Sequence, residues 1–403
     1  MLIVFLFGLI LSASPMTAAR VQGGVGPLDI VMLIAAMLSS IFCFRSSAIL
    51  QTSSYQQSPT RNLYQEPVAR FWIWTIPVLT ASTLLNISNG NMLFSSLGRD
   101  ALALMGSIVT TIAVSIAFMS RYRLALIYGF CFGAVVIAIA YAVFAVSGSI
   151  GYNDDGRFVG GSLNPNQTAL HALTFAIVCY FSSKSLPVPS RVLRLILFAA
   201  IICSLIFGLA TQSDAFRLAV IPILAVFALK VSENVLGSTT KGSVVIVFLV
   251  LVTLGVIEYR DPTFFTTKLQ EVSGGLSTGN QDYDRIALWE NGIAAWQENI
   301  FLGNGIGAWS GISGPFEGME AHNVIIDWLS ITGIFGLIIY LNLFMQVFKF
   351  NLKQNLDRYL IFFGIVIFGM FGFYFRSPVY WVVFIGIYYQ EKYQNPKRIK
   401  VSI

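Results

Sequence analysis

Long apolar runs alternate with short polar connections along the whole chain. A run of about 17–25 apolar residues is long enough to cross a bilayer as a helix. The pattern predicts an all-α, polytopic membrane protein with about twelve transmembrane helices in one integral membrane domain, residues 1–403. The predicted spans are residues 1–19, 28–44, 71–87, 101–119, 124–147, 165–183, 192–211, 214–230, 242–258, 322–348, 358–375 and 378–390.

Composition agrees with this pattern, because 56% of the residues are apolar and only 11% are charged. Soluble domains have about 25% charged residues, and disordered chains are poor in the Leu, Ile, Val and Phe that abound here.

The first fourteen residues resemble the core of a signal peptide but lack a basic start, which favours an uncleaved first helix. We expect the four cysteines to be small buried residues without a disulfide or metal role: Cys43, Cys131, Cys179 and Cys203.

The basic residues indicate an orientation. Seventeen of the 25 Lys and Arg residues fall in the even-numbered connections and the C-terminal tail, and eight fall in the odd-numbered connections. The positive-inside rule then places both termini in the cytoplasm. The net charge of +6 reflects this basic inner face and gives no support for nucleic-acid binding.

One connection is long and is predicted to face outward, residues 259–321 between the ninth and tenth spans. From Asp284, a plausible N-cap, apolar residues recur every three or four positions and form a stripe on one face of a helix: Ile286, Trp289, Ile293, Trp296 and Ile300. This amphipathic helix either lies on the membrane interface or packs on the other helices of the protein. Glycines from Gly303 to Gly314 then predict a flexible or tightly turned stretch.

Two arginines lie beside outer helix starts that carry capping signals. Arg157 precedes a glycine-rich turn and Asn164-Pro165, in which Asn164 is the expected N-cap. Arg217 follows Ser213 in the first turn of another span. A helix N-terminus attracts anions, and a guanidinium group suits phosphate, so both positions are candidate anion sites.

Each arginine also has a simpler interpretation. Arg157 is close in sequence to Asp154 and Asp155, and Arg217 lies one helical turn after Asp214, so ion pairs within the chain stay open as alternatives. Arg376, which precedes another Ser-Pro helix start, is better explained as an interfacial arginine that extends to the lipid headgroups.

The chain has two histidines. His322 lies at the start of the tenth span, with Glu320 close enough to orient a ring nitrogen and Asn323 beside it. Imidazole suits general acid–base work because its ordinary pKa is about 6.5. The alternative for His322 is a structural histidine hydrogen-bonded in the loop, and His171, inside the sixth span, is better explained in this way.

Several arginines and one histidine on the outer face favour a dianionic, lipid-held substrate such as a diphosphate-linked lipid.

One motif resembles that of a known family. His322-Asn323, nine residues and then Gly333-Ile334-Phe335-Gly336 are similar to the H-N-x9-G-x-x-G pattern of the bacterial O-antigen ligase superfamily. That superfamily also includes repeat-unit polymerases and protein O-oligosaccharyltransferases. The turn after Arg157 and the loop segments Asp284-Arg285, Trp289 and 303–307 are similar to other parts of it. The resemblance covers roughly residues 155–345, and the first 150 residues share only the hydropathy profile.

The resemblance implies an inverting glycosyltransferase that needs no metal or cofactor and acts on the periplasmic side of the bacterial inner membrane. Its donor would be a glycan on undecaprenyl diphosphate, and its acceptor a glycan or a lipid A-core sugar. The residues carried over are His322 as catalytic base and Arg217, Arg285 and Arg157 as the diphosphate-binding group, with Glu320, Asn323 and Asn164 in support.

One departure from the family weakens the assignment of Arg217. The family often has Ser followed directly by Arg at this helix start, whereas here Asp214 follows Ser213 and the arginine comes three residues later. The histidine motif favours a ligase over a polymerase, which stays the main alternative. A secondary transporter with twelve spans is a remote alternative, because transporters keep ionisable residues near the membrane midplane and these spans are almost free of charge.

Overall fold

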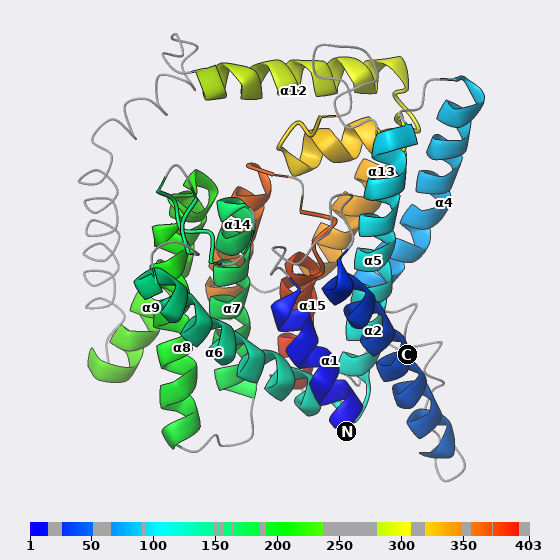
Figure 1. Cartoon of the computed structure of the whole chain (residues 1–403). Coiled ribbons are helices and arrows are strands. Elements are labelled where there is room, and N and C mark those ends of the chain that lie inside the picture. Colours follow the sequence, from blue (N-terminus) through cyan, green and yellow to red (C-terminus); the bar gives the residue numbers. More distant parts are fainter. Residues whose placement is uncertain are drawn as a thin grey trace.

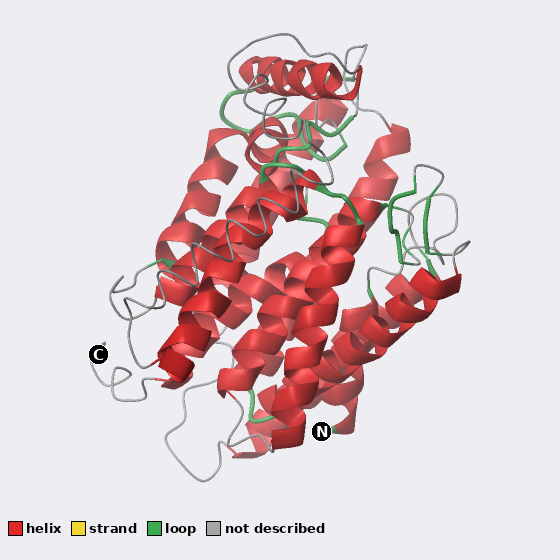
Figure 2. Cartoon of the chain, turned by 90° about the vertical axis from the view of Figure 1, so that its left-hand side faces the viewer, coloured by secondary structure: helices red, strands yellow, loops and turns green. Residues whose placement is uncertain are grey.

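The predicted all-α class is confirmed. The computed structural model describes residues 1–14, 26–50, 66–90, 94–147, 151–153, 156–160, 162, 164–185, 191–236, 280–307, 319–348, 356–372 and 374–394. Within these ranges the chain forms twelve helices and no β-strand beyond one isolated bridge between Tyr152 and Phe158 (Figure 2).

The helices follow the apolar runs. In chain order they are α1 (Leu2–Ala13), α2 (Pro27–Leu50), α4 (Pro67–Ser88), α5 (Phe94–Met119), α6 (Arg123–Ser147), α7 (Pro165–Ser185), α8 (Arg191–Ala210), α9 (Asp214–Leu236), α12 (Asn280–Glu298), α13 (Val324–Val347), α14 (Leu356–Gly369) and α15 (Pro378–Gln394). Each predicted run overlaps one of these helices, except the run 242–258, which lies outside the described residues. Helix α12 is the predicted helix of the long connection.

Several helices have the length and composition of membrane spans. Among the described residues, five are long and apolar enough to cross a bilayer: Pro27–Arg45, Pro67–Ser88, Asp100–Met119, Arg123–Val146 and Val324–Val347. Shorter apolar helices are Leu2–Ala13, Leu195–Ala210 and Pro378–Tyr389. The chain is therefore a multi-pass membrane protein by these criteria, while the total of twelve spans, the single domain and the outward position of residues 259–321 stay predictions.

The long helices form a bundle, and α12 lies across one end of it (Figure 1). The N-terminus lies at the opposite end, and α9 and α13 both begin at the end that α12 covers. Helix α14 packs along α9, where a Cβ atom on Gly364 would lie 2.7 Å from the carbonyl oxygen of Ala219. The end covered by α12 is therefore the place where several helix starts meet.

A cluster of buried aromatic rings holds the starts of α13 and α15 together. Trp328 of α13 packs against Phe375, which precedes α15, with ring centroids 4.5 Å apart. Trp72 of α4 packs against Trp381 of α15 at 4.9 Å, and the Trp381 indole N–H donates to the Phe375 carbonyl at 3.0 Å. Large buried aromatic contacts of this kind fix the relative positions of helices.

Two helix starts agree with the capping signals, and two others differ from the prediction. Helix α7 begins at Pro165 and α15 at Pro378, as expected. Asp284, however, lies inside α12, because the polar residues from Asn280 already continue the helix, so its assignment as N-cap is wrong. Helix α5 begins at Phe94, which places Asp100 inside the helix rather than in a connection.

Candidate active site

His322 lies in a short turn that is fixed on both sides. Asn323 is the N-cap of α13, and its side-chain oxygen accepts from the backbone N–H groups of Ile325 and Ile326 at 3.0 and 3.4 Å. The carboxylate of Asp327, one turn into the helix, accepts from the N–H groups of Ala321 and Asn323 at 2.7 and 3.1 Å. These bonds satisfy N–H groups at the start of the helix and leave little freedom to the backbone of His322 between them.

The backbone of His322 is itself unusual, with φ 55°. Residues other than glycine rarely adopt this left-handed conformation, which costs about 1–2 kcal/mol. Strained backbone of this kind gathers at functional sites. The side chain is 48% exposed, so the imidazole is accessible while its backbone is held.

Glu320, which is near in sequence, and Arg376 and Asp100, which are distant in sequence, form a group of charged side chains with His322. The Nδ1 atom of His322 lies 3.9 Å from Oε2 of Glu320. The other oxygen of Glu320 pairs with Nη2 of Arg376, and Nη1 of Arg376 donates to Oδ1 of Asp100 at 2.7 Å. We call His322, Glu320, Arg376 and Asp100 the histidine group.

Two members of the histidine group were not expected from the sequence. Arg376 is 25% exposed and lies between two carboxylates, which differs from an interfacial arginine that extends to the headgroups. Asp100 is fully buried in α5. The predicted span begins one residue after Asp100, which assigns this carboxylate to a connection. Because α5 begins at Phe94, Asp100 instead lies inside the helix, where an acidic residue is a signal of function.

A second group surrounds the start of α9 and contains Arg157 and Arg217; we call it the arginine group. Nε of Arg157 donates to the carbonyl of Thr211 at 3.0 Å, and Nη1 of Arg217 lies 3.5 Å from Oδ1 of Asp214. Ser213 precedes α9 and is 1% exposed, with no hydrogen-bond partner for its hydroxyl group among the described residues. A buried hydroxyl, two cations and a helix N-terminus together have the chemistry of an anion site.

The structure bears on the simpler interpretations of both arginines. The pair between Arg217 and Asp214 exists in this structure. Asp154 and Asp155 lie outside the described residues, so their pairing with Arg157 stays a prediction. Asn164 accepts from the N–H of Asn166 at 2.8 Å, as expected of the N-cap of α7.

Arg285 belongs to α12, and its side chain lies outside the described residues. The backbone of α12 crosses the end of the bundle at which α9 and α13 begin (Figure 1).

Helix α14 contacts α9 and the start of α13. It packs along α9 through Gly364, and one turn later a Cβ atom on Gly369 would lie 3.6 Å from the side chain of Val324, the first residue of α13. The histidine group and the arginine group thus share one end of the bundle, and each has its own partners.

The Gly-x-x-Gly part of the motif breaks α13. Gly333 has φ 61° and ψ −160°, which is not helical. The segment after α12 enters this break: the N–H of Ile334 donates to the carbonyl of Ile300 at 2.9 Å, and the N–H of Gly305 donates to the carbonyl of Ile331 at 3.0 Å. Positive φ angles at Gly303, Gly305 and Gly307 confirm the predicted tight turn in this part of the glycine-rich stretch. The break therefore docks the end of the long connection against the first half of α13.

We expect Gly333→Ala to lower the thermal stability of the protein and its activity. Alanine pays a steric penalty at this φ, and its Cβ would overlap the carbonyl group of Phe301. The matched control is Gly106→Ala in α5, where a Cβ meets nothing within 4 Å and alanine favours a helix by about 1 kcal/mol. Thermal unfolding in detergent checks both variants, and equal melting temperatures would show that the break tolerates a side chain.

The amphipathic helix presents its predicted apolar stripe only partly to the protein. Leu288 and Ala295 of α12 are buried, whereas Ile293 and Ile300 of the predicted stripe are 40% and 42% exposed. Trp289 and Trp296 of the same stripe are half-buried, so the stripe lies at the edge of the face that packs on the bundle. Both interpretations of the stripe, contact with the membrane interface and packing on the other helices, therefore stay predictions.

The other candidate features lie apart from this end or are structural. His171 is buried, stacks on Phe175 with centroids 5.5 Å apart and lies 3.3 Å from the Tyr141 hydroxyl, as expected of a core histidine. Cys203 is partly exposed, and the other three cysteines are buried as expected. Within the described ranges, no group of three or more His, Cys, Asp or Glu side chains is placed to hold a metal ion.

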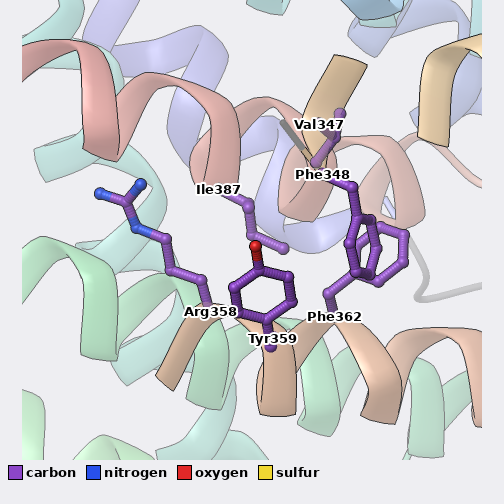
Figure 3. Close-up of a pocket in the computed structure, with 6 residues that line it drawn as sticks. All are labelled: Val347, Phe348, Arg358, Tyr359, Phe362 and Ile387. Carbon is purple, nitrogen blue, oxygen red and sulfur yellow. The ribbon is translucent and has the colours of Figure 1, made fainter. Parts of the chain in front are cut away.

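A small pocket lies at the far end of α13 from His322 (Figure 3). The view shows the guanidinium of Arg358 directed away from the aromatic rings. The remaining lining is apolar apart from one tyrosine hydroxyl group, so the pocket offers little to a charged substrate. Its lining residues are Val347, Phe348, Arg358, Tyr359, Phe362 and Ile387.

Fold and site together define a helical multi-pass membrane protein with a histidine group and an arginine group at one end. The model of the O-antigen ligase family matches residues 198–341, from within α8 to within α13. This match confirms the resemblance to the O-antigen ligase and polymerase superfamily. It includes Arg217, Arg285 and His322. No curated protein matches the chain.

Proposed function

We propose that the protein is a glycosyltransferase that moves an undecaprenyl-diphosphate-linked oligosaccharide or polysaccharide en bloc onto a sugar hydroxyl group, as an O-antigen ligase in lipopolysaccharide assembly. The observation that carries this proposal is an accessible imidazole, held by a fixed turn and a paired carboxylate, at the same end of the bundle as two arginines. The family match to O-antigen ligases supports it.

The two groups suit the two halves of a displacement reaction. The acceptor oxygen forms a bond to the anomeric carbon of the glycan, the bond from that carbon to the diphosphate oxygen breaks, and His322 takes the acceptor proton. Arg217, Arg157 and Arg285 stabilise the charge that develops on the diphosphate. A single in-line displacement inverts the anomeric configuration. It also requires the base and the leaving-group site on opposite sides of the reacting carbon.

The location follows from the same proposal. The positive-inside distribution predicts cytoplasmic termini, and the N-terminus lies opposite the end that α12 covers. The active site would then face the periplasm, at the outer leaflet of the bacterial inner membrane. A lipid-linked donor would keep its chain in the bilayer while its diphosphate lies at this end.

Lipopolysaccharide from a deletion strain tests the ligase assignment. We expect lipid-linked polymer to accumulate and the lipid A-core to carry no O-antigen, because the last transfer is lost. A core that carries a single repeat unit would instead indicate a repeat-unit polymerase. Unchanged lipopolysaccharide and exopolysaccharide would contradict both. Complementation with the wild-type gene is the control.

A further inference from the structure

Arg376 joins the histidine group from outside the matched family region and bridges two carboxylates. Its two terminal nitrogens contact different partners, Asp100 of α5 and Glu320 of the turn before α13. A guanidinium group can hold two acceptors in a fixed geometry because its donors lie in one plane. The bridge therefore ties the turn that carries His322 to a membrane helix.

Both ends of this bridge are well anchored. Asp100 is fully buried, and a buried carboxylate needs a charged or hydrogen-bonded partner. Arg376 lies in a turn that is itself held, since the N–H of Ser377 donates to the carbonyl of Tyr374 at 2.9 Å and the neighbouring Phe375 is buried in the aromatic cluster. Glu320 is therefore held by a residue that has little freedom of its own.

The bridge determines what Glu320 can do to His322. One oxygen of Glu320 is engaged by Arg376, and the other lies 3.9 Å from Nδ1 of His322. A carboxylate beside one ring nitrogen favours the tautomer with a proton on that nitrogen, so that Nε2 is the ring nitrogen that can act as a base. Without the bridge, Glu320 would be an ordinary loop side chain with many rotamers.

We propose that Arg376, supported by Asp100, is a positioning residue: it holds Glu320 in the orientation that presents His322 as a base. The inference rests on the proposed role of His322, and it assigns to Arg376 no contact with the substrate. It predicts that the effect of Arg376 on transfer passes through Glu320.

A double-mutant cycle tests this dependence. The variants are Arg376→Gln, Glu320→Gln and the two combined, measured in purified full-length protein with a lipid-diphosphate-linked glycan donor. We expect Arg376→Gln to lower kcat by roughly 10- to 100-fold, the usual effect of losing such a supporting contact, with little change in KM for the donor. The double variant should be about as active as Glu320→Gln alone, because residues that act as one unit are not additive.

The pH–rate profile provides a second readout that a purely structural role would not produce. The charged groups around His322 are Glu320 on its own turn, Asp327 in α13, Arg376 before α15 and Asp100 in α5. Loss of the positive charge in Arg376→Gln favours imidazolium directly, whereas release of Glu320 from the ring disfavours it. The shift of the acid limb to higher pH should therefore be smaller when Arg376→Gln is made in the wild type than when it is made in Glu320→Gln, and equal shifts in the two backgrounds would contradict the inference. Loss of the negative charge in Glu320→Gln should move that limb to lower pH.

The controls separate this inference from the proposed function. Arg121→Gln removes an exposed arginine near Tyr122, away from the site, and should leave kcat unchanged. If Arg376→Gln fails to accumulate, because the buried Asp100 loses its ion pair with Arg376, Arg376→Gln combined with Asp100→Asn removes both charges and takes its place in the cycle. Multiplicative effects in the cycle, or a wild-type kcat in Arg376→Gln, would overturn the inference. Full activity in a His322 variant would overturn the proposed function first.

Discussion

Replacing His322 with glycine should abolish glycan transfer and leave the protein folded. Loss of a general base lowers a rate by roughly 10²- to 10⁴-fold. Glycine adopts the left-handed backbone of this position, φ 55°, without steric cost. The substitution therefore removes the imidazole and relieves the backbone strain at once. Transfer from a lipid-linked donor, measured with purified protein, should fall to background while the melting temperature stays close to that of the wild type.

Two further substitutions at this position separate chemistry from backbone. Asparagine also tolerates the left-handed conformation, so His322→Asn should be as stable as His322→Gly and equally inactive. His322→Ala should also be inactive. Its melting temperature should be lower than those of His322→Gly and His322→Asn, because alanine is strained at this φ. Transfer by the glycine variant within a few-fold of the wild type would remove the base from the mechanism.

The helices could be predicted from the sequence because each depends on its own residues. Apolar runs give the spans, and Asn164-Pro165 and Ser377-Pro378 mark helix starts through local capping. The two helix starts that differ from the prediction, at Phe94 and Asn280, involve polar residues that extend a helix beyond its apolar run. Local pattern thus predicts where a helix exists better than where it begins.

The motif residues were found from the sequence, but the structural role of the glycines was not. Gly333 breaks α13 to receive the backbone of residues 300–305, and the pairing depends on how α12 turns back onto α13. The contacts of Arg376 could not be predicted from the sequence either, because 276 residues separate it from Asp100. No local signal specifies such a pair. The sequence indicates His322 and its neighbour Glu320, whereas only the structure shows that Arg376 and Asp100 hold Glu320.

Arg217→Ala should impair use of the lipid-linked donor by roughly 100-fold or more in kcat/KM, since removing a donor to a developing negative charge costs about that much. The side chain of Arg217 is 11% exposed, so water replaces its charge poorly. Arg217→Lys should recover only part of the loss, because an ammonium group cannot grip phosphate with two parallel hydrogen bonds. Initial rates at varied donor concentration give kcat and KM for each variant.

Asp214→Asn distinguishes diphosphate binding from the ion pair within the chain. The substitution keeps the shape of residue 214 but removes the charge that lies 3.5 Å from Arg217. If Arg217 serves the donor, Asp214→Asn should retain activity within several-fold of the wild type, because the guanidinium group that contacts the diphosphate is still present. If the pair itself is what matters, Asp214→Asn should be as impaired as Arg217→Ala, and Arg217→Lys, which preserves the charge, should behave as wild type. That result would assign Arg217 to the structure of the α9 start and leave the diphosphate to Arg157 and Arg285.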